Sequence, residues 1–88
     1  MQRLFIDVRE PEEFKAGHIK GARNIPPNVL MNGMNFTDIP KDSELVLYCR
    51  TGSRSAAAMM HLKNQGYSNM VNGINKEQAS RRFGVELE

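Results

Sequence analysis

The sequence predicts an α/β fold in which a small, mainly parallel central sheet is flanked by helices. Short apolar, strand-forming runs alternate along the chain with segments that carry helical start and stop signals. The chain has 88 residues and contains no internal repeat, linker or low-complexity segment. This length favours one domain, spanning 1–88, around one small core.

The first half of the chain should supply two strands and one helix. The run Leu-Phe-Ile-Asp-Val at 4–8 is typical of a strand buried on both faces. A helix of about two turns is expected at 11–17, because proline suits the first helical position, acids the first turn and glycine the end. A short strand at 22–25 is closed by two prolines. Positions 29–36 predict no regular element, since their apolar residues surround an Asn-Gly turn signal.

The clearest strand in the sequence lies at 44–48, where an apolar run follows an Asp-Ser break. A helix is expected at 55–65. Its three consecutive alanines would let it approach the sheet closely, with Met59, Met60 and Leu62 as the larger packing residues.

The C-terminal third continues the alternation. Gly66 suits the left-handed position that ends a helix, and Tyr67 suits the apolar contact that follows it. The last strand is expected at 69–71 and an amphipathic helix at 76–82.

Composition excludes several classes of function. A formal net charge of +2 without basic runs argues against nucleic-acid binding, and no apolar stretch is long enough to cross a membrane. The N-terminus carries no secretory leader, so we expect a cytoplasmic protein, or a periplasmic one if a leader was removed. One cysteine cannot form an internal disulfide, and with two distant histidines it does not suggest a metal site. No cofactor is expected.

The single cysteine, Cys49, lies between the predicted strand at 44–48 and the helix that follows. Open α/β sheets place their ligand sites at this position, and helix N-termini present unpaired amides and partial positive charge. Gly52 would let the loop curl so that its amides point inward, and Arg50 and Arg54 add fixed charge. These features favour the thiolate and attract anions. The alternative is a buried cysteine packed as a small apolar residue, which the Arg-x-Gly-x-Arg pattern disfavours.

Two motifs carry a family resemblance. The loop "CRTGSRS" at 49–55 and the stretch "FIDVREPEEFKAGHIKGARNIP" at 5–26 resemble single-domain rhodanese-like sulfurtransferases of the phage-shock type. The resemblance covers roughly positions 4–71. It implies the three-layer rhodanese fold, in a minimal version that lacks the family's leading strand and helix.

The resemblance also implies an activity. A thiolate at Cys49 would take a sulfane sulfur from thiosulfate or a similar anionic donor and pass the resulting persulfide sulfur to cyanide, a thiol or a protein acceptor. Asp7 and Arg9 are expected to brace the site through a salt bridge. Substrate and thiolate stabilisation is implied for the loop residues Arg50, Thr51, Gly52, Ser53, Arg54 and Ser55.

Two other functions stay open. One is a persulfide carrier or docking module that serves a specific protein partner, which would use the same residues. The other, a cysteine-dependent phosphatase or arsenate reductase, is disfavoured because only four residues separate Cys49 from Arg54, where those enzymes use five. The stretch at 72–75 replaces a Gly-Gly loop that the family commonly has beside the site, so the choice of donor and acceptor need not follow the family's. His18 is interpreted as a cap of local backbone, and Glu12 and Glu13 as first-turn acids.

Overall fold

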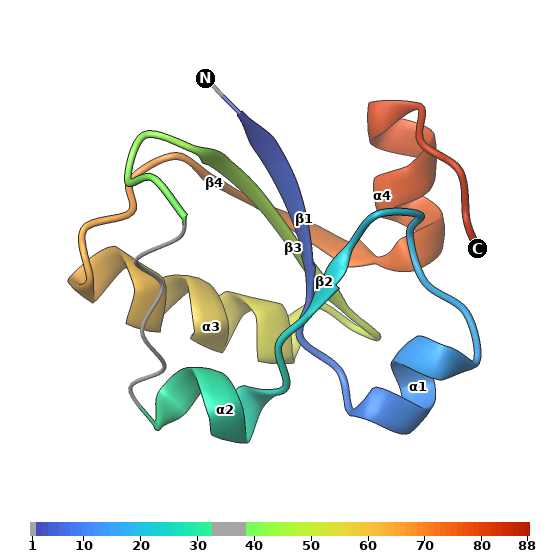
Figure 1. Ribbon diagram of the computed structural model, residues 1–88, viewed down its shortest axis with the longest axis horizontal. Helices are drawn as coiled ribbons and strands as arrows, with labels where there is room; N and C mark the ends of the chain where they lie inside the picture. Colours follow the sequence, from blue (N-terminus) through green and yellow to red (C-terminus); the bar gives the residue numbers. More distant parts are fainter. Residues whose placement is uncertain (1, 33–38) are drawn as a thin grey trace.

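The structure, a computed structural model, describes residues 2–32 and 39–88. Strands and helices alternate along the described chain (Figure 1). In chain order the elements are β1 (Arg3–Asp7), α1 (Pro11–Lys15), β2 (Arg23–Asn24), α2 (Pro27–Met31), β3 (Glu44–Cys49), α3 (Ser53–Asn64), β4 (Met70–Asn75) and α4 (Lys76–Phe83). None of the helices in the described ranges is long and apolar enough to cross a membrane.

The four strands form one parallel sheet in the order β2-β1-β3-β4, which confirms the predicted architecture. The chain passes from β1 outward to β2 on one side, and later from β3 outward to β4 on the other. The direction of winding therefore reverses between β1 and β3, where Asp7 pairs with Tyr48. In open sheets of this kind ligands bind outside the carboxyl ends of the strands at such a reversal.

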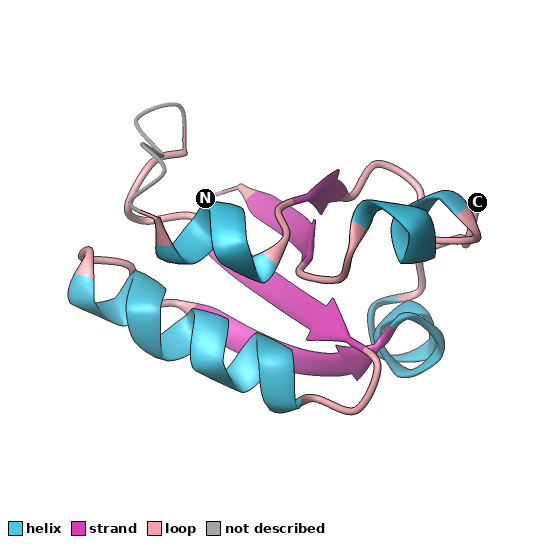
Figure 2. Cartoon of the chain, turned by 90° about the horizontal axis from the view of Figure 1, so that it is seen from below, coloured by secondary structure: helices cyan, strands magenta, loops and turns pink. Residues whose placement is uncertain are grey.

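Helices cover both faces of the sheet, as the three-layer prediction requires (Figures 1 and 2). Alternate residues of β3 divide between the two layers because side chains alternate across a strand. Leu45, Leu47 and Cys49 belong to the main core, which α2 and α3 cover. Tyr48 belongs to a smaller cluster with Ala79 of α4. The cysteine side chain therefore lies on the α3 side of the sheet.

The C-terminal end of α3 confirms the predicted cap. Gly66 has φ of 104° and its amide bonds the Lys63 carbonyl, while the Tyr67 amide bonds the Leu62 carbonyl. These two bonds satisfy carbonyls that the helix end leaves open. Tyr67 is buried, and its hydroxyl donates to the Ile39 carbonyl at 2.7 Å.

Several boundaries differ from the predictions. Helix α3 begins at Ser53, two residues earlier than expected, because Gly52 at φ 95° starts it directly after the cysteine loop. Strand β4 is longer than 69–71 and continues into α4 without a linker. Met60 was expected to pack inside but is 72% exposed.

Helix α2 was not predicted at all. Two consecutive prolines were interpreted as the end of a strand, but Pro27 occupies the first turn of α2, where a missing amide costs nothing. Leu30 is its buried residue. The rest of the stretch for which no regular element was expected, from position 33, lies outside the described residues.

The C-terminal tail forms a short antiparallel bridge with the segment after α1. Ile19 bridges Leu87, and His18 and Glu88 exchange backbone hydrogen bonds of 3.0 and 2.7 Å. This contact places the tail beside the turn that leads from α1 to β2.

Candidate active site

Cys49 ends β3 and is 2% exposed. The loop that follows curls around its sulfur, so the amide of Gly52 donates to Sγ at 3.1 Å. The hydroxyl of Ser55, in the first turn of α3, lies 3.6 Å from the same sulfur. The predicted inward-facing loop is therefore present, and the left-handed Gly52 is the residue that allows it.

Opposing effects set the acidity of the thiol. Burial raises the pKa of Cys49, because an apolar surrounding disfavours the charged form. The Ser55 hydroxyl and the amides of Ser55, Gly52 and Thr51 outweigh burial and lower the pKa to about 7. Near neutral pH the site thus holds a substantial fraction of thiolate. The largest causes that lower the pKa are the loop donors, and the Arg54 guanidinium also interacts electrostatically with Cys49.

The two arginines differ in their surroundings. Both terminal nitrogens of Arg54 bond the carboxylate of Glu13, Nη1 to Oε1 at 2.9 Å and Nη2 to Oε2 at 3.1 Å. Arg54 thereby joins α3 to α1. Arg50 is exposed at the rim of the site. Its predicted role, attraction of an incoming anion, stays a prediction.

Glu13 is a site residue that the sequence analysis missed. It was interpreted only as a first-turn acid, which explains its bond to the Glu10 amide at 3.0 Å. The Arg54 hydrogen bond and, next, the Glu10 amide lower the pKa of Glu13 to about 2. No spacing rule connects positions 13 and 54, so only the folded chain shows the pair.

The predicted salt bridge between Asp7 and Arg9 is confirmed, and both residues are buried. Nε of Arg9 donates to Oδ1 of Asp7 at 2.9 Å, and Nη2 donates to Oδ2 at 2.6 Å. Nη2 also reaches the Gly17 carbonyl at 2.6 Å. The side-chain amide of Asn24 adds to this arrangement, since its Nδ2 donates to the backbone carbonyls of Asp7 and Arg9. These hydrogen bonds connect the end of β1 to the turn after α1.

Strand β4 holds the cysteine loop from the other side. Nδ2 of Asn72 donates to the Gly52 carbonyl at 3.0 Å, and Oδ1 accepts from the Ser55 hydroxyl at 2.6 Å. Oδ1 also accepts the Ile74 amide at 3.0 Å. The contacts of Asn72 were not predicted, because the stretch at 72–75 was interpreted only as an altered loop.

The backbone at positions 73 and 74 restricts which residues fit there. The register of β4 against β3 shifts between Leu47 and Tyr48, and Gly73 lies at that irregularity. A Cβ on Gly73 would lie 3.0 Å from the Ala79 Cβ, so no larger side chain fits without movement. Ile74 has φ of 74°, which is rare for a β-branched residue.

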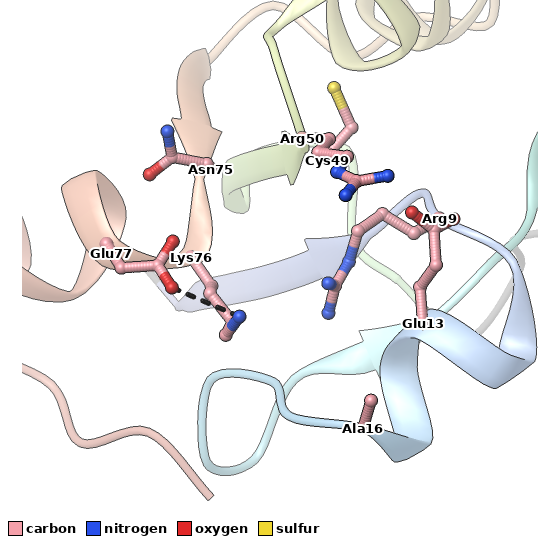
Figure 3. Close-up of a pocket in the computed structure, with 8 residues that line it drawn as sticks. All are labelled: Arg9, Glu13, Ala16, Cys49, Arg50, Asn75, Lys76 and Glu77. Atoms are coloured by element: carbon pink, nitrogen blue, oxygen red, sulfur yellow. Dashed lines mark ion pairs between the residues drawn. The ribbon is translucent and has the colours of Figure 1, made fainter.

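A pocket of about 360 Å³ meets Cys49 outside the carboxyl ends of the strands. Figure 3 shows the Cys49 sulfur turned toward the start of α3, with Arg9 and Lys76 on the side away from it. Lys76 is paired with Glu77 at 3.1 Å, and Arg9 with Asp7. Arg50 is the pocket cation without an ion pair among residues 2–32 and 39–88. The lining residues are Arg9, Glu13, Ala16, Cys49, Arg50, Asn75, Lys76 and Glu77.

His18 acts on local backbone, as predicted. Its Nδ1 lies 2.8 Å from the Phe14 carbonyl, and its ring stacks on Phe14 with centroids 3.7 Å apart. Nε2 contacts Glu88 in the C-terminal tail at 3.1 Å. These contacts occupy both ring nitrogens.

An α/β domain that holds an ionisable cysteine among backbone amides at the reversal of its sheet has the features of a site that reacts through a thiolate. The particular family follows from comparison. The family model for the rhodanese-like domain matches residues 1–76, and the chain belongs to this family.

Several curated relatives are named as sulfurtransferases. The chain is 38% identical over 69 residues to a sulfurtransferase of Allochromatium vinosum, covering 78% of this chain and 63% of that protein. It is 39% identical to the adenylyltransferase and sulfurtransferase uba4 of Ogataea parapolymorpha, covering 78% of this chain and 18% of that protein. Identity to the thiosulfate sulfurtransferase GlpE of Ectopseudomonas mendocina is 32%, over 74% of this chain and 58% of that protein. The chain therefore spans less than two thirds of the length of these relatives.

Solved structures show the same fold. A rhodanese with anions from E. coli superposes with a TM-score of 0.76 at 29% identity, covering 86% of this chain and 89% of that one. A rhodanese-related protein of Thermoplasma volcanium gives a TM-score of 0.76 at 30% identity, over 98% and 83% of the two chains.

Proposed function

We propose that this domain is a thiosulfate-type sulfurtransferase that carries sulfur as a persulfide on Cys49. The observation that supports this most directly is the set of donors around one buried thiol. The Gly52 amide, the Ser55 hydroxyl and the amides of Thr51 and Ser55 lower its pKa to about 7 despite burial. A packed structural cysteine needs no such donors.

The reaction consists of two displacements on sulfur. The Cys49 thiolate attacks the outer sulfur of thiosulfate, a new S–S bond forms, and sulfite leaves with the electron pair of the broken bond. A nucleophilic acceptor such as cyanide then attacks the terminal sulfur of the persulfide. Thiocyanate forms, and the thiolate returns with its electron pair. No oxidant or proton donor is consumed in either step.

The site supports both steps electrostatically. The donors that stabilise the thiolate are aimed at an anionic sulfur and would also stabilise the persulfide anion after transfer. Arg50 at the rim would attract the doubly charged donor. Four residues between Cys49 and Arg54 enclose a small cradle, which suits a single sulfur better than a tetrahedral phosphate.

Steady-state turnover of thiosulfate and cyanide tests the proposal. We expect thiocyanate formation by the natural sequence and none by Cys49→Ser, because a hydroxyl at neutral pH supplies no comparable nucleophile. Cys49→Ser should unfold in urea at nearly the same concentration as the natural sequence, which shows that the loss is chemical. Turnover by Cys49→Ser would overturn the covalent mechanism.

Thiocyanate formation, combined with the intact mass of the protein, separates an enzyme from a persulfide carrier. The relative from Ogataea combines two named activities in a protein of which this chain covers 18%, so a carrier role within a larger system is a specific alternative. Intact-mass measurement after incubation with thiosulfate reports the added sulfur atom. A stable persulfide without thiocyanate would favour the carrier, and rapid loss of that mass with cyanide would favour the enzyme.

A further inference from the structure

The hydroxyl of Ser55 lies between two acceptors. It is fully buried, 2.6 Å from Oδ1 of Asn72 and 3.6 Å from the Cys49 sulfur. The Gly52 carbonyl is a third neighbour at 3.1 Å. A hydroxyl has one proton to donate, so only one of these atoms can receive it at a time.

The Gly52 carbonyl is already occupied. It accepts the Ala56 amide at 3.0 Å and Nδ2 of Asn72 at 3.0 Å, which fills its two lone pairs. The orientation of the Asn72 amide follows from its partners, because only Nδ2 can donate to a carbonyl and only Oδ1 can accept the Ile74 amide. The Ser55 proton is therefore left with Asn72 and Cys49.

The geometry points to Asn72 as a positioning residue that competes with the Cys49 sulfur for the proton of Ser55. While the sulfur is a thiol, Ser55 donates to Asn72 over the shorter distance. Once the sulfur is an anion, as thiolate or persulfide, the hydroxyl turns toward it, because a charge-assisted hydrogen bond is stronger than a neutral one. Asn72 thus limits how strongly Ser55 stabilises the anion. This inference rests on the proposed function in taking Cys49 as the reacting atom.

A double-mutant cycle measured by alkylation tests the competition. Iodoacetamide rates across pH report the thiolate fraction of Cys49 without any sulfur donor. We expect Asn72→Ala to raise the alkylation rate at pH 6 by about threefold, because the Ser55 proton is released to the sulfur. In the Ser55→Ala background the same substitution should give no increase, since no hydroxyl remains to turn.

Other results would overturn the inference. Equal changes in the two backgrounds would mean that Asn72 acts only by holding the Gly52 carbonyl. A lower rate in the Ser55-containing protein would mean that Asn72 assists the hydroxyl rather than competing for it. Asn64→Ala, at the exposed end of α3, is the matched control and should leave the alkylation profile unchanged.

A second variant decides the question if Asn72→Ala does not fold. Asn72→Asp keeps the shape but offers a carboxylate that holds the Ser55 proton more strongly. It should slow alkylation at pH 6, and by more when Ser55 is present than in the Ser55→Ala background. An equal slowing in both would reflect the added charge alone and would overturn the proposal. Because no turnover is measured, a failure here is distinct from a failure of sulfur transfer.

Discussion

The guanidinium of Arg54 and the carboxylate of Glu13 form a two-point ion pair that joins the first turn of α3 to α1. Both side chains are partly exposed, at 33% and 27%. The pair fixes the helix that carries Ser55, while the hydrogen bonds to the sulfur come from the Gly52 amide and the Ser55 hydroxyl. Arg54 therefore links two helices of the site in addition to its electrostatic interaction with Cys49.

The Glu13–Arg54 pair should make stability depend on pH at the acidic end. The pKa of Glu13 is about 2 in the folded protein, below its unfolded value, so its contribution is complete above the unfolded pKa. It is lost as pH falls from about 4.5 toward 2. We expect the free energy of unfolding in urea to decrease less over this range in Glu13→Gln than in the natural sequence. Parallel pH profiles would contradict the assignment.

Arg50→Ala should weaken donor binding without changing the acidity of the thiol. Arg50 is exposed at the pocket rim, and the causes that lower the Cys49 pKa are the Ser55 hydroxyl and loop amides. We expect a higher KM for thiosulfate, more so at low salt where charge attraction is least screened, with the alkylation midpoint near pH 7 retained. A shifted midpoint would show that Arg50 acts on the sulfur directly.

Asp7→Asn should destabilise the fold severely, because it leaves the buried Arg9 guanidinium without its counter-charge. Breaking one side of a buried pair typically costs about 3–5 kcal/mol. Asp7 is 0% and Arg9 6% exposed, so solvent cannot compensate. Glu44→Gln, which breaks the more exposed pair with Arg3, should cost less than about 1 kcal/mol. Similar urea midpoints for the two variants would contradict this expectation.

At position 74 glycine should be better tolerated than alanine. Ile74 holds a left-handed φ of 74° with 36% of the residue exposed. Alanine would lose the packing of the side chain and keep the strain, whereas glycine removes the strain. We expect Ile74→Gly to unfold at higher urea than Ile74→Ala, by about 1 kcal/mol in free energy. At ordinary strand positions alanine is more stable than glycine. If Ile74→Ala unfolded at higher urea than Ile74→Gly, the backbone at position 74 would have relaxed to an ordinary conformation.

Much of this fold can be predicted from local patterns. The apolar run of β3, the stop signal at Gly66 and the alternation of strands with helices each depend on neighbouring residues, and each is confirmed. Helix α2 escaped prediction because consecutive prolines end a strand as readily as they begin a helix. The predicted cysteine loop was also found where a strand meets a helix.

The missing parts of the site are contacts between distant segments. Glu13 reaches Arg54 across 41 positions, and Asn72 reaches Gly52 across 20. Neither pair follows from spacing, and each depends on which strands become neighbours.

The burial of the only cysteine has a practical consequence for handling the protein. A lone thiol can form a disulfide only with another chain, and at 2% exposure the Cys49 sulfur is shielded from a second folded copy. A parallel sheet needs all its crossovers before this protection exists, so the thiol is open throughout refolding. The fraction of disulfide-linked dimer in a non-reducing gel would therefore report the fraction of chains that unfolded during storage.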